Sequence, residues 1–361
     1  HRRHVRFAVE LAEQKSQGIQ ELTLRGATDM TVTDFDSFRG RDVHLYTLTG
    51  DGLTVGVTDF GAAVQFIRLA TRAGEKDVTL GYNDIEARIA SGTYCGATIG
   101  RVANRIRGGF GLGGVRYELA GNEGANCNHG GLSGFDKRFF DAEDSGSALS
   151  LTLLSPDGDG GFPGNMRLRV TYTVTGRTLS VRYDAESDAD TLFSPTCHIY
   201  FNLGGEDCGS AMDTRLRINA AHYPPVGPDP IPPGELRAVD GTPFDFRTIK
   251  RIGRDIGADD DQLLLCGGYD HNYVLCSSHA ATAECERTGA TLDLYTDLPG
   301  LQLYTANGLG GVGKTREYRP RDAFCLEPQF FPNAINTPGF APPLLKKGEK
   351  TSYYIKYVFG A

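Results

Sequence analysis

Apolar and polar residues alternate with a period of two along most of the chain after residue 40. The clearest case runs over 166–174, where apolar residues alternate with Arg and Thr, and it resumes over 179–183 after a Thr-Gly-Arg turn. Such a pattern is typical of a β-hairpin that buries one face. Similar segments lie at 53–57, 115–119, 150–154, 292–296 and 353–359. The pattern therefore predicts many short antiparallel strands.

Turn-forming residues separate these strands and leave room for few helices. Clusters of Gly, Asp and Pro lie at 157–161 and 224–234. Gly accounts for 47 of the 361 residues, nearly double its usual share of about 7%. The strongest helical pattern is short, at 83–90. We therefore predict a mostly β protein in which residues 41–361 form one large antiparallel β-sandwich.

The first 40 residues differ from the rest of the chain. Their composition suggests a short helix over 5–20 and a polar linker over 26–40. We treat residues 1–40 as an N-terminal extension of unknown role, and we expect the chemistry of the protein to lie in residues 41–361.

The charge balance and the hydropathy of the chain limit the classes of partner that it is expected to bind. Lys and Arg number 37 against 45 Asp and Glu, a formal net charge of −8, so no basic excess is available to neutralise a phosphate backbone. No stretch of 18 apolar residues could span a membrane, and the first residues show no hydrophobic leader. We expect a cytoplasmic protein that binds neither nucleic acid nor membranes.

Eight cysteines are scattered through the chain, at positions 95, 127, 197, 208, 266, 276, 285 and 325. None belongs to a CxxC pair, whereas a zinc site requires clustered ligands. A disulfide framework is typical of small secreted domains and not of a chain of this size. We expect neither a metal site nor a disulfide framework.

Six segments place chemically versatile side chains inside or beside apolar strands. They read GRVANRI at 100–106, NHGG at 128–131, CHIYFNL at 197–203, YDHNYVL at 269–275, LQLYT at 301–305 and CLEPQFFPN at 325–333. An Arg can donate several hydrogen bonds to a hydroxylated or anionic ligand, a His can act as an acid near neutral pH, and a desolvated Glu can act as a base. Taken alone, each segment is as readily explained by a turn, a core histidine or, for Gln302, a solvent-exposed face.

Taken together and in this order, the six segments resemble the motifs of the aldose 1-epimerase family, the galactose mutarotases. The family carries GR-x-ANRI, N-x-LHGG, NH-x-YFNL, YDH, LQ-[FY]-Y and LE-x-x-FPD segments in the same order, and the resemblance covers roughly residues 41–359. It implies a large antiparallel β-sandwich of the galactose mutarotase type, which agrees with the period-two pattern.

The resemblance also implies a role for each matching residue. It makes His198 the general acid and Glu327 the general base of the family's reaction. The positions that match the family's sugar-binding residues are Asn104, Arg105, His129, Asp270 and Gln302. This chain departs from the family motifs beside the implied site, at Cys127, Asn128, Cys197 and Asn333. Those departures bear on substrate preference more than on the reaction.

The implied reaction interconverts the α and β anomers of a hexose such as glucose or galactose. A base removes the proton of the C1 hydroxyl while an acid protonates the ring oxygen, and the ring opens and recloses on the other face. No redox step occurs and a paired acid and base suffice, so the resemblance implies no cofactor and no metal. We expect a monomer or homodimer that acts in carbohydrate metabolism, galactose metabolism included.

Charges near the implied pair suggest how it titrates. The negative charges of Asp270 and Glu327 are expected to raise the pKa of His198, and the positive charge of Arg105 is expected to keep Glu327 ionised. Turnover should then follow a bell-shaped pH profile with a wide neutral range.

Three other functions stay open. A hexose-6-phosphate 1-epimerase of the same fold needs basic residues for the phosphate, for which Arg101 and Arg107 are the nearby candidates. A non-catalytic sugar-binding protein has no need to keep both His198 and Glu327. A glycoside hydrolase usually needs two carboxylates, whereas this pair is a His and a Glu.

Overall fold

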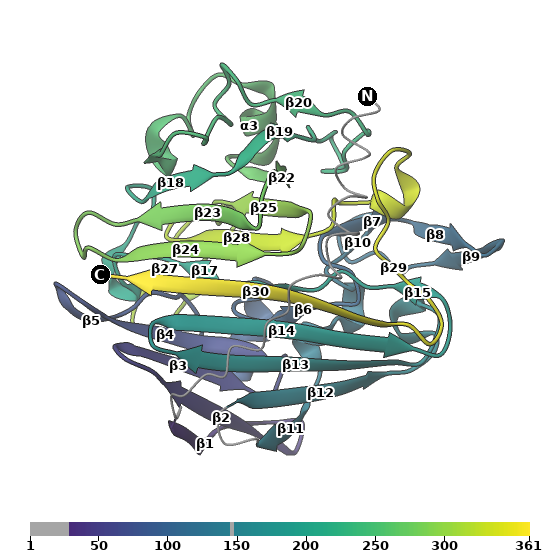
Figure 1. The fold of residues 1–361 in the computed structure, drawn as a ribbon, viewed down its shortest axis with the longest axis horizontal. Coiled ribbons are helices and arrows are strands. Elements are labelled where there is room, and N and C mark those ends of the chain that lie inside the picture. The colour runs from purple at the N-terminus through teal and green to yellow at the C-terminus, as the bar shows by residue number, and fades with distance from the viewer. Residues whose placement is uncertain (1–28, 145–147) are drawn as a thin grey trace.

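The computed structural model describes residues 29–144 and 148–361, and the helix expected over 5–20 lies outside these ranges. Within the described ranges, strands dominate and the paired strands of every sheet run antiparallel. Two large sheets and a smaller third one form the body of the molecule (Figure 1). The predicted fold class, a mostly β antiparallel sandwich, is confirmed.

The largest sheet has nine strands and spreads across Figure 1. It contains the predicted hairpin, whose burial alternates residue by residue because one face packs into the core. In spatial order its strands are β11 (Asp141–Asp144), β12 (Leu149–Ser155), β13 (Met166–Thr175), β14 (Thr178–Ser187), β30 (Lys350–Gly360), β24 (Thr291–Thr296), β23 (His279–Glu284), β18 (Arg215–Ile218) and β21 (Lys250–Arg251).

A six-stranded sheet shares a core with the nine-stranded one. Leu301, Leu303 and Leu326 of the smaller sheet join Val181 and Ile355 of the larger sheet in one apolar cluster. This arrangement leaves the other face of the six-stranded sheet free to carry polar groups. In spatial order its strands are β17 (Tyr200–Phe201), β28 (Phe324–Gln329), β25 (Gly300–Tyr304), β22 (Asp270–Leu275), β19 (Ala220–Tyr223) and β20 (Arg237–Ala238).

A five-stranded sheet at the N-terminal end corrects one expectation. Its strands follow chain order as β1 (Asp29–Phe38), β2 (Arg41–Thr49), β3 (Leu53–Thr58), β4 (Ala63–Thr71) and β5 (Gly74–Asp77). The polar linker expected over 26–40 is wrong for 29–38, because β1 pairs with β2 along its length. β1 lies at the edge of its sheet, and residues 30–38 are exposed or only partly buried, so its apolar positions mark no buried face. The division of the chain after residue 40 stays a prediction.

Short ribbons, two α-helices and six 3-10 helices of three residues each complete the described chain. The ribbons pair β7 (Arg105–Arg107) with β10 (Asn126–Asn128), β8 (Gly109–Leu112) with β9 (Val115–Glu118), β6 (Thr98–Ile99) with β16 (Thr196–Cys197), β15 (Thr191–Leu192) with β29 (Leu344–Leu345), and β26 (Gly311–Val312) with β27 (Glu317–Tyr318). The helices are α2 (Ile85–Ser91) and α3 (Asp261–Cys266).

Helix α2 confirms the helical pattern at 83–90. The side chain of Asp84 caps its first turn by accepting a hydrogen bond from the N–H of Ala87 at 2.7 Å. Gly92 ends the helix in the left-handed conformation, with φ of 64°, where glycine has no steric penalty. Strong local signals at both ends therefore place this helix.

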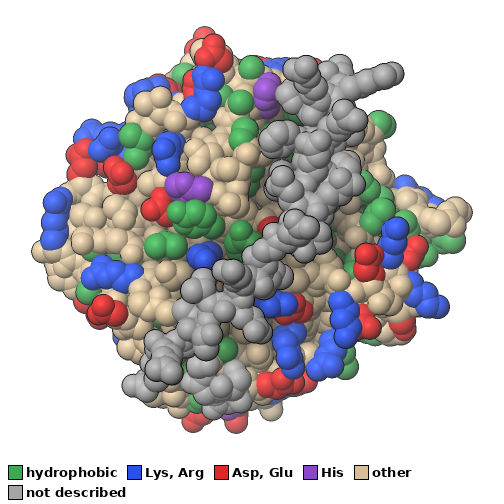
Figure 2. All heavy atoms as spheres, in the orientation of Figure 1, with side chains coloured by type: hydrophobic (Ala, Val, Ile, Leu, Met, Phe, Trp, Pro, Cys, Tyr) green, Lys and Arg blue, Asp and Glu red, His purple; other side chains and the backbone are tan. Residues whose placement is uncertain are grey.

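Charged side chains of both signs lie on the visible surface of the described chain, with hydrophobic ones between them (Figure 2). On the face that Figure 2 shows, basic and acidic side chains of the described residues are interspersed. Within residues 29–144 and 148–361, none of the helices combines the length and the apolar character that crossing a bilayer would require.

Candidate active site

One face of the six-stranded sheet carries a row of polar side chains from three neighbouring strands. Asn272 of β22 is paired with Gln302 of β25, which is paired in turn with Glu327 of β28. Directly opposed residues of antiparallel strands point to the same face, so the three side chains stand side by side. Asp270 lies two residues before Asn272 and shares this face.

Gln302 is buried in this row, at 2% exposure, so the solvent-facing alternative for it is wrong. Its amide nitrogen donates a hydrogen bond to Oδ1 of Asp270 at 2.7 Å, and its amide oxygen accepts one from Gln329 at 3.4 Å. The alternating residues Leu301 and Leu303 fill the core on the opposite face. Gln302 therefore fixes the orientation of the Asp270 carboxylate.

His198 and Glu327 meet in the same region. His198 directly follows β16, and its Nε2 lies 3.5 Å from Oε2 of Glu327. Both residues are almost fully buried, at 3% and 2% exposure. Among the described residues, neither Oε2 of Glu327 nor Nδ1 of His198 has a hydrogen-bond partner. Buried polar atoms without partners are rare in folded proteins, so this pair is built to interact with something other than the fold.

Burial decides where the proton of this pair resides. It raises the pKa of Glu327 to about 8, with the charge of Asp270 adding to the rise and that of Arg105 opposing it. It lowers the pKa of His198 to about 4. The directions expected from neighbouring charges, a raised pKa for His198 and an ionised Glu327, are therefore wrong. Desolvation of two fully buried groups outweighs those charges.

His129 adds a second imidazole beside the pair. Its ring centroid lies 5.1 Å from that of His198, and its Nδ1 accepts a hydrogen bond from the N–H of Asn104 at 3.2 Å. That bond leaves the ring proton on Nε2. Burial, together with the charges of His198 and Arg105, lowers the pKa of His129 well below its usual range. His129 is thus a neutral donor through Nε2.

Arg105 lies between two carboxylates at the start of β7. Its guanidinium forms a two-pronged ion pair with Glu123, and its Nη2 lies 3.7 Å from Oδ2 of Asp270. Such fork geometry fixes the guanidinium plane. Asn104 accepts a hydrogen bond from the N–H of Arg105 at 2.9 Å through its own Oδ1. All seven predicted site residues are thus accounted for, in one network of contacts.

Strained backbone carries two of these residues. The φ angles of Asn104 and His129 are 62° and 53°, in the left-handed region that costs a non-glycine residue about 1–2 kcal/mol. Backbone strain of this kind clusters at functional sites, where the surrounding structure holds it in place.

Arg101 is a structural residue and does not reach the site. It is 2% exposed, and its guanidinium donates to the carbonyl oxygens of Ser155, Pro156, Pro163 and Gly164 at 2.6–2.9 Å. Its N–H groups bind backbone carbonyls of residues 155–164 and are not available to a ligand. The expectation that it could bind an anionic or hydroxylated ligand is therefore wrong.

Arg107 points away to the surface. Its half-exposed side chain forms an ion pair with Asp229 at 2.9 Å. The alternative of a hexose-6-phosphate substrate therefore loses Arg101 and gains no support from Arg107.

The departures from the family motifs act behind the site. Cys197 is buried in the main core. Asn333 donates from its N–H to the carbonyl of Arg105 at 2.7 Å, and its side chain accepts from the N–H of Arg107 at 3.1 Å. Asn128 is held through its backbone by Asn122. These residues support the backbone around Arg105 and His129.

Three contacting residues were not predicted from the sequence. Gln329 lies two residues after Glu327 on β28, fully buried, so the period-two pattern could have indicated it. Glu123 and Tyr94 come from loops, where no periodic signal exists. Tyr94 nevertheless packs its ring against both His129 and His198.

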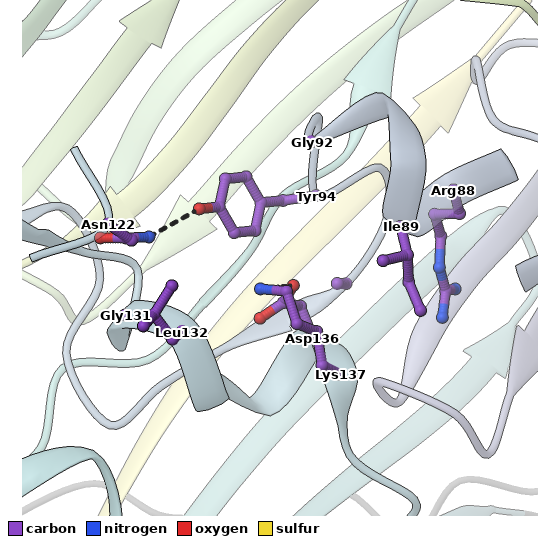
Figure 3. A pocket seen from close by; sticks show the side chains of 10 residues that line it. Arg88, Ile89, Gly92, Tyr94, Asn122, Gly131, Leu132, Asp136 and Lys137 are labelled. Carbon is purple, nitrogen blue, oxygen red and sulfur yellow. Dashed lines mark hydrogen bonds and ion pairs between the residues drawn. The ribbon is translucent and has the colours of Figure 1, made fainter. Parts of the chain in front are cut away.

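A cavity of about 220 Å³ lies beside the acid–base pair and shares the wall formed by Tyr94 (Figure 3). Arg88 and Ile89 of α2 line it on one side, and Asp136 and Lys137 line it on another. Neither His198 nor Glu327 belongs to its lining. The cavity is therefore a neighbour of the site and not the site itself.

His129, His198 and Glu327 are the group of described residues that could hold a metal ion. Each offers one ligand atom, and the three atoms lie within 4.8 Å of one another. Zinc bonds of about 2.0–2.2 Å in a tetrahedron place ligand atoms about 3.5 Å apart, so the group would have to close around an ion. The cysteines take no part in it.

Comparison with known proteins gives a consistent set of relatives. The family model described as aldose 1-epimerase matches residues 44–358. Galactose mutarotase of Sus scrofa is 37% identical over 326 residues, which cover 88% of this chain and 94% of the relative. Aldose 1-epimerase of Escherichia coli (strain K12) is 35% identical over 337 residues, covering 89% and 96%.

Solved structures show the same fold. A crystal structure of an aldose epimerase homologue from C. elegans superimposes with a TM-score of 0.82 at 29% identity, covering 88% of this chain and 98% of that one. Galactose 1-epimerase from Lactobacillus acidophilus gives a TM-score of 0.81 at 30% identity, covering 92% and 99%.

Proposed function

This chain belongs to the aldose 1-epimerase family, and from that premise we propose that it interconverts the α and β anomers of a hexose such as glucose or galactose. The observation that supports this most strongly is the buried contact of His198 with Glu327, in which neither Oε2 of Glu327 nor Nδ1 of His198 is engaged in a hydrogen bond with another described residue. An acid and a base held 3.5 Å apart can serve the two oxygens on either side of an anomeric carbon.

Glu327 is the proposed base and His198 the proposed acid. Glu327 removes the proton of the C1 hydroxyl, and His198 donates a proton to the ring oxygen, so the C1–O5 bond breaks and an open-chain aldehyde forms. Rotation about the C1–C2 bond presents the other face of the carbonyl. The two residues then exchange roles, and the ring recloses with no net gain or loss of protons.

The pair needs one proton in total for this reaction. Between the pKa of His198 near 4 and that of Glu327 near 8, the pair holds one proton, which resides mainly on Glu327. Moving it to His198 gives the productive state, with an ionised base and a protonated acid. Because both arrangements contain the same number of protons, their ratio does not change with pH across this range.

The remaining site residues are proposed to bind the sugar hydroxyls. Arg105 and His129 supply donors, whereas Asp270 supplies an acceptor whose direction Gln302 fixes. Asn104 holds both Arg105 and His129 through its backbone and side chain. A site that binds hydroxyls away from C1 accepts both anomers.

We also propose cytoplasmic action in hexose metabolism, including that of galactose, as a monomer or homodimer. Those proposals rest on family membership alone. The hexose-6-phosphate alternative is the weaker one, because Arg101 is fully engaged inside the fold.

The activity itself is tested by polarimetry of freshly dissolved α-D-glucose and α-D-galactose. We expect the approach to the equilibrium rotation to accelerate in proportion to protein concentration for at least one of the two sugars. Acceleration with glucose 6-phosphate and with neither free sugar would support the phosphate alternative instead.

Replacing Asp270 by Asn is expected to shift the alkaline limb of kcat/KM to lower pH. The negative charge of Asp270 disfavours a second negative charge on Glu327 and so helps to raise its pKa. Without that charge Glu327 ionises at lower pH, and the pair loses its proton earlier. A pH profile of kcat/KM on wild type and variant measures the shift, and an alkaline limb that stays in place contradicts the assignment of that limb to Glu327.

Dialysis against EDTA is expected to leave the activity unchanged. The proposed mechanism uses the side chains of His198 and Glu327 for proton transfer, so an ion bound to them would block it. Polarimetry before and after dialysis gives the comparison. A loss of activity that zinc or magnesium restores would show that the group formed with His129 is a working metal site.

A further inference from the structure

The imidazole of His198 stacks on two tyrosine rings. The Tyr200 ring lies 5.1 Å away, centroid to centroid, and its plane is inclined by 12°. The Tyr94 ring lies 5.9 Å away and is inclined by 19°. These are offset-stacked geometries, in which aromatic faces are turned towards the imidazole. Neither tyrosine belongs to the proposed sugar-binding set.

Tyr94 is fixed in this position by its surroundings. Its backbone is left-handed, with φ of 59°, and its hydroxyl accepts a hydrogen bond from Asn122 at 3.2 Å, drawn as a dashed line in Figure 3. Asn122 also forms two hydrogen bonds with the backbone of Asn128: it donates to the carbonyl and accepts from the N–H. The ring of Tyr94 is thereby tied to the loop that carries His129, whose ring lies 4.8 Å away.

Tyr200 is fixed by the sheet. It lies on β17, is paired with Cys325 of β28 and is 3% exposed. The ring of Tyr304 contacts it edge to face at 6.3 Å. Rings held this firmly restrict the rotation of the imidazole that they flank.

We propose that Tyr94 and Tyr200 are positioning residues that restrict the rotation of the His198 imidazole and stabilise its protonated form. The inference rests on the proposed role of His198 as the acid. It identifies an interaction that stabilises the imidazolium, which burial disfavours. A cation over an aromatic face is attracted by the ring quadrupole, more strongly where water is excluded. The stacked rings therefore offset part of the desolvation that disfavours the productive state.

The charged groups around His198 act on its protonated form in opposite directions. In the productive state the ionised Glu327 of β28 lies 3.5 Å from His198 and favours the imidazolium, whereas His129 is neutral. Beyond them lie the cations Arg105 and Lys137, the latter with its ammonium 5.3 Å from the centroid of the Tyr94 ring, and the carboxylate of Asp270. The two cations disfavour an imidazolium and the carboxylates favour it, and the two stacked rings add a favourable contact on the face of the imidazole.

Replacing Tyr94 by Leu is expected to lower the pKa of His198 by about one unit and the plateau of kcat/KM by about tenfold, since a cation–π contact in a dry site is worth roughly 2- to 30-fold. The acid limb moves to lower pH with the histidine, whereas the alkaline limb, which reports Glu327, stays. The pKa is read in the whole chain by NMR titration of the 15N-labelled imidazole, assigned with His198→Asn.

Two variants serve as matched controls. Tyr94→Phe keeps the ring and loses only the hydroxyl, so it should retain the wild-type pKa of His198. Tyr82→Leu removes a buried ring from the same apolar cluster as Tyr200, but that ring packs on Tyr318. It should reduce stability without moving the titration of His198.

The outcomes separate this inference from the proposed function. An unchanged or raised pKa of His198 in Tyr94→Leu overturns the inference, and so does an equal fall in Tyr82→Leu. A lowered pKa with unchanged kcat/KM supports the stacking interaction and removes His198 from the acid role. Tyr200→Leu should reproduce the shift, and because Tyr94 is partly exposed, its variant gives the answer even if Tyr200→Leu does not fold.

Discussion

Replacing Glu327 by Gln is expected to lower kcat for anomerisation by about 10²-fold or more, the range in which a general base contributes. The amide keeps the shape and the hydrogen-bonding capacity of the side chain, but it cannot take the proton of the C1 hydroxyl. Binding of the sugar should be largely retained, because Arg105, Asp270 and Gln302 are untouched. Polarimetry gives kcat, and isothermal titration calorimetry gives the dissociation constant.

Gln329→Glu is an instructive companion to that variant. Gln329 lies two residues along β28 and is as buried as Glu327, so the double exchange Glu327→Gln with Gln329→Glu retains one carboxylate on the same strand face. Only a carboxylate next to His198 has the 3.5 Å contact, so activity should not return. Wild-type turnover in Glu327→Gln would remove this residue from the role of base.

Replacing Arg101 by Leu is expected to lower the free energy of unfolding by about 4 kcal/mol or more. Four backbone carbonyls lose a charged donor at once, and each buried polar group left unpaired costs about 1–3 kcal/mol. Urea denaturation followed by circular dichroism measures the change. Sugar binding by the folded fraction should stay close to that of wild type, since Arg101 does not reach the site.

Arg107→Leu is the matched control for Arg101. This arginine is six residues further along, its side chain is 57% exposed and its ion pair with Asp229 lies at the surface. Such pairs contribute about 0–1 kcal/mol, so the stability should hardly change. A large loss in Arg107→Leu, or a small one in Arg101→Leu, would contradict the distinction that the structure draws between them.

Strand β25 shows which parts of the structure could be predicted from the sequence and which could not. Period-two alternation predicted the strands and the two faces of β25. It does so because successive side chains of a strand point to opposite faces, so a buried face requires an apolar residue at every second position. It could not tell that the polar face of β25 is also buried. Gln302 is 2% exposed and forms hydrogen bonds with Asp270 and Gln329 of the neighbouring strands, and only the packed structure shows this.

Arg101 shows the same limit for hydrogen bonds. The sequence places two arginines four residues apart, and nothing local separates the one that binds carbonyls 54–63 positions away from the one that forms an ion pair with Glu123. The resemblance to family motifs resolved what local chemistry could not, since it singled out Arg105. Glu123 and Tyr94 carry no such motif and became visible only as neighbours of Arg105 and His198.

Protonation was the least accessible property. From the sequence, only the charges near His198 and Glu327 could be weighed, and they predict a protonated histidine and an ionised glutamate. Burial reverses both directions, because an ion loses more in leaving water than these neighbours return. The site therefore works with a single shared proton, which makes His198 and Glu327 one functional unit.

A double-mutant cycle tests most directly whether His198 and Glu327 act as one functional unit. Polarimetry of α-D-galactose is performed on wild type, Glu327→Gln, His198→Asn and the double variant at equal folded concentration. If the acid and the base share one proton, either single change removes the whole contribution, and the double variant should lose about as much as each single variant. Losses that multiply in the double variant would show two independent residues and would contradict the shared-proton mechanism.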